Sequence, residues 1–187
     1  MAKNKKASDA DSSLVLTRIS RTLLFFVSFF ALSTVIFDSG NLITRELVIE
    51  RWVLTSILLA AIIASWSVAA LTRYGTAHKI FIAITAAELL LFAGFVTYWE
   101  RGMASTSTIL YVLPILVIAT LRNRHILLGT TALAAGVYAL SAVLYFNTYF
   151  NEGYRIQLWG TLFQQVSTLF VTAWLIMTLT GLRRDSK

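Results

Sequence analysis

Six long apolar segments alternate with short polar ones along the chain. The apolar segments cover approximately residues 14–37, 52–71, 80–99, 105–121, 125–146 and 157–182. Each is long enough to cross a hydrocarbon core of roughly 30 Å at about 1.5 Å per residue. In lipid only a helix or a closed barrel satisfies its own backbone, and these runs are continuous rather than alternating. The expected fold is therefore all-α: a polytopic membrane protein with a bundle of six transmembrane helices.

The first segment contains two cations, Arg18 and Arg21, so its lipid-buried part is expected to begin near Thr22. We expect residues 1–21 to form a basic cytoplasmic tail and the start of the first helix. Residues 22–182 then form the six-helix domain, and residues 183–187 form a cytoplasmic tail. A signal peptide is the alternative for the first segment, but the stretch ALSTVIFDSG offers no convincing small-x-small cleavage site.

Lysine and arginine are distributed unevenly between the polar connections. With the N-terminus inside, only Arg45, Arg51, Arg101 and Arg155 of the 16 lysines and arginines fall outside. Basic residues concentrate in the cytoplasmic connections of membrane proteins. We therefore expect a multi-pass protein of the cell (cytoplasmic) membrane, with its N- and C-termini in the cytoplasm.

The composition excludes several classes of function. With 57% hydrophobic and 13% charged residues, the chain is too apolar for a soluble domain of this size. The absence of cysteine excludes disulfides, thiolate metal sites and haem attachment through CxxCH. A net charge of +7 could indicate nucleic-acid binding, but the basic residues lie at helix ends and in the N-terminal tail. We therefore expect the lipid bilayer as a partner and expect no binding of nucleic acid.

Motifs for catalysis are missing from the sequence. There is no HExxH, P-loop, GxGxxG or GxSxG motif, and no membrane segment carries paired carboxylates. The two histidines, His78 and His125, stand at cytoplasmic helix ends next to Lys79 and Arg124, without an obvious acidic third ligand. We expect no enzyme activity, no catalytic residues, no cofactor and no metal site.

One carboxylate, Glu88, lies inside the third segment. It is nine residues beyond Lys79, or about 13 Å along a helix, near the middle of the hydrocarbon core. Because no cation is expected at that depth, the acid should be largely protonated and turned into the bundle.

Gln164, Gln165 and Thr168 of the last segment lie at a comparable depth. Together with Glu88 they form the candidate buried polar site. A glutamine is the preferred partner, since an amide both donates to and accepts from a carboxylic acid. Two roles stay open for this site: a hydrogen bond that fixes helix packing, or a ligand- or proton-responsive group.

Aromatic residues gather at the expected outer ends of the helices. The candidate outer-face aromatic surface consists of Trp52, Tyr98, Trp99, Tyr145 and Trp159. Such residues are typical of an interfacial belt. A recognition surface for an amphiphilic ligand is the alternative.

Two features concern how the helices pack. Ser56, Ala60 and Ala64 are spaced four residues apart on the second segment, which is typical of closely packed membrane helices. Pro114 lies within the fourth segment and is expected to kink its helix, because proline removes a hydrogen bond and clashes with the preceding turn.

The middle of the chain carries a recognisable order of features. It reads ELLLFAGFVTYWERG, then MASTSTILYVLPILVIATLRNRHILL, then TTALAAGVYALSAVLYF. This order resembles the six-helix N-terminal membrane domains of bacterial sensor histidine kinases. In those domains an acidic residue opens a run of leucines, and an outer loop with glycine and serine follows. A helix with a Leu-Pro-Ile core, a basic turn and a helix with an internal tyrosine come next. The corresponding positions here are Glu88, 102–107, 113–115, 122–124 and Tyr138.

The resemblance implies a membrane sensor or anchor module with the kinase half absent. Such a module would signal or assemble through its cytoplasmic face, with a cytoplasmic kinase, another membrane subunit or a second copy in a homodimer as partner. The chain would be either a piece of a longer protein or a module of its own.

Two other functions stay open. Six helices in a chain of this length also resemble the substrate-binding subunits of energy-coupling-factor vitamin transporters, which capture a ligand near the outer face. An accessory subunit of a larger membrane complex is the third reading. The sequence favours the sensor or anchor module.

Overall fold

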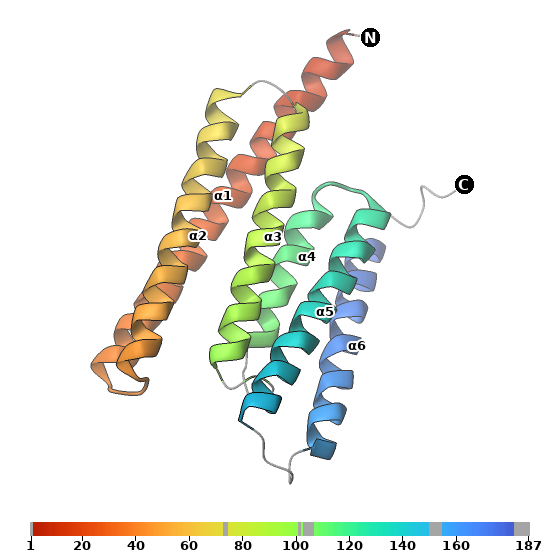
Figure 1. The fold of residues 1–187 in the computed structure, drawn as a ribbon. Helices are drawn as coiled ribbons and strands as arrows, with labels where there is room; N and C mark the ends of the chain where they lie inside the picture. Colours follow the sequence, from red (N-terminus) through yellow and green to blue (C-terminus); the bar gives the residue numbers. More distant parts are fainter. Residues whose placement is uncertain (1, 73–74, 101, 103–106, 150–154, 182–187) are drawn as a thin grey trace. The chain divides into compact units, whose positions relative to one another are not determined.

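The structure is a computed structural model that describes residues 2–72, 75–100, 102, 107–149 and 155–181. Every regular element in these ranges is helical (Figure 1). In chain order the elements are α1 (Ala2–Ser39), α2 (Arg45–Leu71), α3 (Gly75–Trp99), the 3-10 helix η2 (Ser107–Tyr111), α4 (Val112–Ala119), α5 (Arg124–Thr148) and α6 (Arg155–Leu179). The chain divides into a first unit, Met1–Glu88, and a second unit, Leu89–Lys187, with the boundary inside α3.

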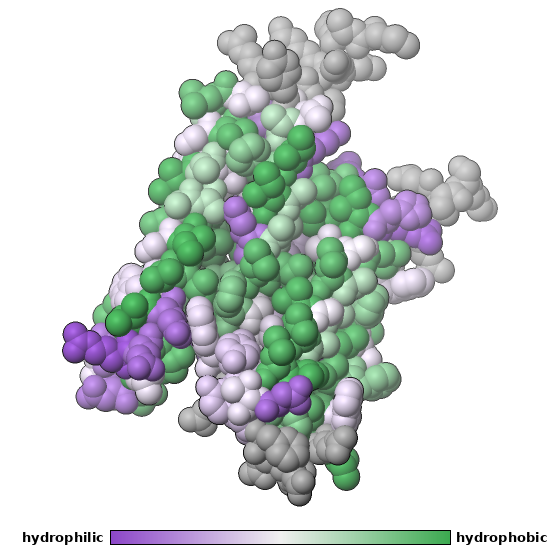
Figure 2. All heavy atoms as spheres, in the orientation of Figure 1, coloured by the Kyte–Doolittle hydropathy of each residue, from purple (hydrophilic) through white to green (hydrophobic). Residues whose placement is uncertain are grey.

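Five described helices are long and apolar enough to cross a membrane. They are Ser13–Ser39, Arg45–Leu71, Gly75–Trp99, Arg124–Thr148 and Ile156–Leu179. On the face that Figure 2 shows, hydrophobic residues cover the flanks of the helices, and hydrophilic residues gather at helix ends such as the α1–α2 turn. The expected all-helical fold is thus confirmed for the described residues, and its five long apolar helices indicate a multi-pass membrane protein, whereas the sixth predicted span is not confirmed.

The fourth apolar segment forms a short helix instead of a long one. Among the described residues of this segment, Ser107–Ala119 is helical, first as η2 and then as α4, with a length of about 22 Å. Pro114 is the third residue of α4 and has no N–H to bond the carbonyl of Leu110. The first turn of an α-helix tolerates this, because its N–H groups lack helical partners anyway. The helix continues from η2 through Pro114 into α4, and the expected kink at Pro114 stays a prediction.

The last helix ends earlier than its apolar run. α6 stops at Leu179, three residues before the predicted end at 182. Gly181 then adopts a left-handed φ of 71°, which favours glycine over residues with a side chain. At the other end of the chain, α1 already begins at Ala2, so the expected N-terminal tail is part of a continuous helix. The expected C-terminal tail, 183–187, lies outside the described residues.

In the first unit, α1 and α2 form an antiparallel hairpin. The Ser13 hydroxyl near the start of α1 donates to the Ala69 carbonyl near the end of α2, at 2.9 Å. Thr44 begins α2 as its N-cap and accepts from the Leu47 N–H at 3.4 Å. The first contact ties α1 to α2 at the open end of the hairpin, and the second defines where α2 begins.

Arg51 is buried in this hairpin, with 7% of its surface exposed. Its guanidinium carbon lies 5.3 Å from the ring centroid of Phe30 and 5.0 Å from that of Phe37. The two phenylalanines are seven residues apart and therefore share one face of α1. Arg51 was counted among the cations of the outer connections, and the structure places it within α2, between two aromatic faces.

We predict a measurable coupling energy between Arg51 and each phenylalanine. A cation over an aromatic ring contributes about 0.5 kcal/mol at an exposed site and about 2 kcal/mol when desolvated. In a double-mutant cycle of Phe37→Leu with Arg51→Met, the unfolding free energy in mixed micelles should show a coupling of this size. Phe29→Leu is the matched control, because that side chain on the same helix is 69% exposed. A coupling no larger for Phe37 than for Phe29 would contradict the prediction.

Candidate functional site

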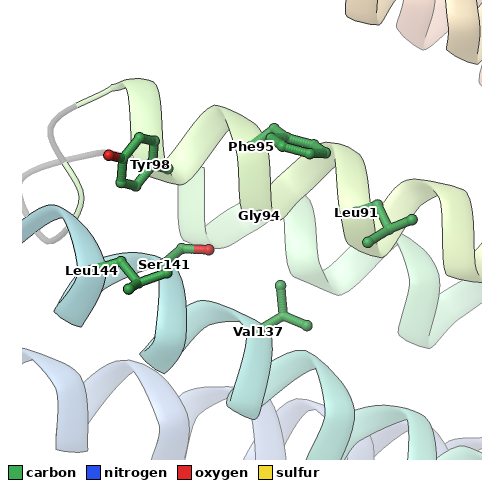
Figure 3. Close-up of a pocket in the computed structure, with 7 residues that line it drawn as sticks. All are labelled: Leu91, Gly94, Phe95, Tyr98, Val137, Ser141 and Leu144. Atoms are coloured by element: carbon green, nitrogen blue, oxygen red, sulfur yellow. The ribbon is translucent and has the colours of Figure 1, made fainter.

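Helices α3 and α5 of the second unit are in close contact at Gly94. A Cβ atom added to Gly94 would lie 2.8 Å from Val137 Cγ1 and 3.4 Å from Ser141 Oγ. Figure 3 shows Val137 and Ser141 reaching from α5 towards the part of α3 that carries Gly94. The missing side chain at Gly94 therefore sets how near the two helices can lie.

The contacts further along show that α3 and α5 run parallel. Gly94 meets Val137, and one turn later the rings of Tyr98 and Tyr145 meet edge to face at 6.2 Å. Gly102 follows, where an added Cβ would lie 2.8 Å from Tyr145 Cβ. Later residues of α3 thus contact later residues of α5, as in parallel helices. The connection between the two helices must return along their length, and η2 and α4 make this return.

Buried hydroxyl groups gather beside this approach. We call Thr97, Ser107, Thr108, Tyr111, Tyr138 and Ser141 the hydroxyl cluster. The Thr97 hydroxyl donates to the Ala93 carbonyl at 2.8 Å. It also lies 2.7 Å from Ser107 Oγ and 3.0 Å from the Tyr111 oxygen. Because a hydroxyl has one hydrogen and two lone pairs, Ser107 and Tyr111 act as donors to Thr97. One threonine therefore ties η2 to α3.

The two tyrosines of the cluster join η2 to α5. Their rings meet edge to face, with centroids 5.6 Å apart and planes at 82°. Tyr111 is 0% and Tyr138 1% exposed. The Ser141 side chain of α5 interacts with the Tyr111 hydroxyl. Aromatic pairs of this geometry add about 0.5–1.5 kcal/mol beyond the burial of their surface.

Two hydroxyls of the cluster have spare hydrogen-bonding capacity. The Thr108 side chain faces the Tyr138 hydroxyl, but the pair does not meet hydrogen-bond geometry. Each oxygen is buried and has no hydrogen-bond partner among the described residues. A buried hydroxyl without a partner costs about 1–3 kcal/mol, so both groups favour any added donor or acceptor that reaches them.

An apolar groove lies between α3 and α5 and shares one residue with the cluster. The α3–α5 groove has a volume of about 290 Å³ and is lined by Leu91, Gly94, Phe95, Tyr98, Val137, Ser141 and Leu144 (Figure 3). Ser141 belongs to both, because on α5 it lies between the groove residue Val137 and the cluster residue Tyr138 in angular position. The groove therefore offers an apolar surface with two hydroxyls, of which that of Ser141 is backed by a polar network.

The residues of the predicted buried polar site are found on two units. Glu88 is half-buried, and one of its carboxyl oxygens is buried without a hydrogen-bond partner among the described residues. On α6, Gln164 and Thr168 are exposed and Gln165 is half-buried. The Thr168 hydroxyl donates to the Gln164 carbonyl of its own helix at 2.9 Å. Because Glu88 ends the first unit and the other three belong to the second, their pairing stays a prediction.

The structure brings together some of the predicted outer-face aromatics. Tyr98 and Tyr145 are in contact, whereas Trp99 stacks on Phe95 at 5.4 Å. Trp159 is 60% exposed on α6, and Trp52 is 41% exposed in the first unit. The pair Tyr98–Tyr145 lies at the end of the α3–α5 groove, which favours the amphiphile-binding alternative for this part of the surface.

The two histidines take part in local helix structure. His78 is 1% exposed, and its Nε2 lies 3.0 Å from the Thr72 carbonyl oxygen at the end of α2. The backbone N–H of His125 donates to the Asn123 side chain, the N-cap of α5, at 3.0 Å. Among the described residues, no group of three or more histidine, aspartate or glutamate side chains is placed to hold a metal ion.

Sequence reasoning missed the hydroxyl cluster apart from Tyr138. The run of serine and threonine before Ile109 and the tyrosine three residues before Pro114 were the available signals. Neither shows by itself which residues of α3 and α5 would meet them. No match was found for the chain among protein-family models, curated proteins or solved structures. The resemblance to sensor domains therefore stays a prediction.

We predict opposite stability effects for alanine at two helical glycines. Gly94→Ala should lower the unfolding free energy by about 1–3 kcal/mol, because its Cβ would overlap Val137 and force α3 and α5 apart. Gly136→Ala on α5 is the matched control. Its Cβ would meet nothing within 4 Å, so it should stabilise by about 0.5–1 kcal/mol. Thermal unfolding of both variants in detergent measures this difference, and equal shifts would disprove the close approach.

Proposed function

We propose that the protein is a non-catalytic sensor or anchor module of the cytoplasmic membrane that signals or assembles through its cytoplasmic face. The observation that carries this proposal is the continuity of the second unit. The α3–α5 groove shares Ser141 with the hydroxyl cluster, and the cluster holds η2 against α3 and α5. Helix α6 in turn contacts α4 and α5. A change in the groove can thus bias the position of α6, which leads towards the basic C-terminal tail.

Six crossings with both termini inside form the topological part of the proposal. Because α3 and α5 are parallel and each is long enough to span, the chain between Trp99 and Arg124 has to recross the same layer. Helix η2 with α4 covers about 22 Å of that path. The basic residues Arg122 and Arg124 at the α4–α5 turn favour the cytoplasm for that turn. In the proposed orientation the groove lies in the outer half of the bilayer.

Cysteine labelling in intact cells tests this topology. The natural chain has no cysteine, so Ser39→Cys and Lys187→Cys each introduce one thiol. A membrane-impermeant maleimide should label position 39 in intact cells and position 187 only after the membrane is opened. External labelling of position 187 would overturn the proposed orientation.

Spin labels at the inner ends of two helices test the coupling to α6. We propose Arg122→Cys with Thr180→Cys in one chain, since both residues are exposed and lie in the second unit. Leu91→Trp places a large ring at the rim of the groove, where leucine is 59% exposed. If the groove is coupled to α6, this change should shift the distance distribution between the two labels.

Leu133→Trp is the matched control for that measurement. Leu133 is 63% exposed on α5 and does not line the α3–α5 groove. The two tryptophan variants should therefore differ. Identical distance distributions in the parent chain, Leu91→Trp and Leu133→Trp would remove the support for sensing.

A ligand-capture subunit of a transporter is the second candidate, and the groove itself favours it. Capture requires a site that binds, but it does not require that binding moves the inner end of α6. Ligand binding at the groove with unchanged label distances would therefore select this candidate over the sensor module.

A further inference from the structure

We infer that the α3–α5 groove binds a neutral amphiphile, with its apolar chain between the two helices and one hydroxyl or carbonyl group at Ser141. This inference rests on the proposed ligand-responsive function and names the chemical class of the ligand. Lipids with a hydroxyl or carbonyl group next to a long apolar chain belong to this class.

The lining of the groove determines the apolar part of the ligand. Five of its seven residues, Leu91, Gly94, Phe95, Val137 and Leu144, carry no polar side-chain atom. From Leu91 to Tyr98 the groove follows α3 for about 10 Å. Leu91, Phe95 and Leu144 are each about half exposed, so a chain lying between the helices can continue beyond the groove into lipid.

The polar groups at the groove determine the charge of the ligand. Ser141 and Tyr98 supply the only side-chain oxygens among the lining residues, and none of these residues carries a charge. A buried charge without a partner costs far more than a buried hydroxyl or carbonyl that forms a hydrogen bond. A carboxylate or an ammonium group would therefore be rejected at this position, whereas a neutral polar group gains a partner.

The spare hydrogen-bonding capacity of the cluster is a second, independent observation. Tyr138 is 99% buried, since 1% of its surface is exposed, and its hydroxyl has no hydrogen-bond partner among the described residues. Tyr138 lies one turn before Ser141 on α5. When a ligand oxygen accepts the Ser141 proton, Tyr111 loses only an accepted hydrogen bond, because its own proton stays on Thr97. The polar network thus adapts to the ligand without leaving a new group unpaired.

Competition with a photoreactive probe tests the inference. The full chain is reconstituted in phosphatidylcholine nanodiscs and labelled with a long-chain alcohol that carries a diazirine in its chain. We expect labelled peptides from 91–98 and 137–144. An unlabelled alcohol and a methyl ketone of the same chain length should compete. The corresponding carboxylate and trimethylammonium compounds should compete at least about tenfold more weakly, because their charges cannot be buried at the groove.

Variants separate the polar contact from the apolar groove. Ser141→Ala should weaken competition by the alcohol about 2- to 10-fold, the effect of losing one hydrogen bond, with little change for an alkane of the same length. Leu91→Trp should abolish labelling in the groove, and Leu133→Trp should leave it unchanged. The tryptophan pair keeps the test valid if Ser141→Ala fails to fold, because both leucines are exposed.

Three outcomes would overturn the inference: equal competition by charged and neutral compounds, labelling that is insensitive to Leu91→Trp, and equal loss of alcohol and alkane binding in Ser141→Ala. None of these three outcomes tests the proposed function, because the spin-label distances in Leu91→Trp are measured without any ligand. A shift of those distances with no selective labelling would support the sensor module and reject the neutral amphiphile.

Discussion

The second unit depends on the close approach of α3 and α5 at Gly94. Because the glycine has no side chain, Val137 and Ser141 can pack against the α3 backbone. This distance lets the Ser141 hydroxyl reach Tyr111 and brings Tyr98 against Tyr145. It also leaves the groove between the residues that flank the contact. Without a hydrophobic driving force between helices in lipid, packing and hydrogen bonds of this kind are the main source of association.

Hydroxyl groups in this protein are placed in two different ways. Exposed residues such as Thr148 and Thr168 donate to a carbonyl of their own helix, four residues earlier. This internal bond makes the hydroxyl tolerable in lipid, since no water is present to replace it. Thr97 makes the same internal bond and in addition accepts from η2. Hydroxyls that bond outside their own helix, such as those of Thr97 and Ser13, join one element to another.

Hydropathy predicted the five long helices because each exceeds the length that a bilayer demands. It could not predict the 3-10 helix η2 in the fourth segment, since apolar composition does not distinguish a long helix from a short one. Gly181 lies just beyond the end of α6 and does not interrupt the apolar run. The predicted segment therefore extended three residues past Leu179. Small-residue spacing was also ambiguous: Ser56, Ala60 and Ala64 are exposed on α2, whose buried face is a different one.

The candidate site was harder to predict than the fold, for a physical reason. Its members come from three elements, and serine, threonine and tyrosine occur throughout the sequence. Their meeting depends on the register of α3 against α5, which Gly94 determines and which no local pattern reports. Arg51 shows the same limit. The sequence predicts an interfacial position for a cation near a helix end, and only the structure shows Phe30 and Phe37 beside it. Glu88, by contrast, was recognisable at once as one acid in an apolar run.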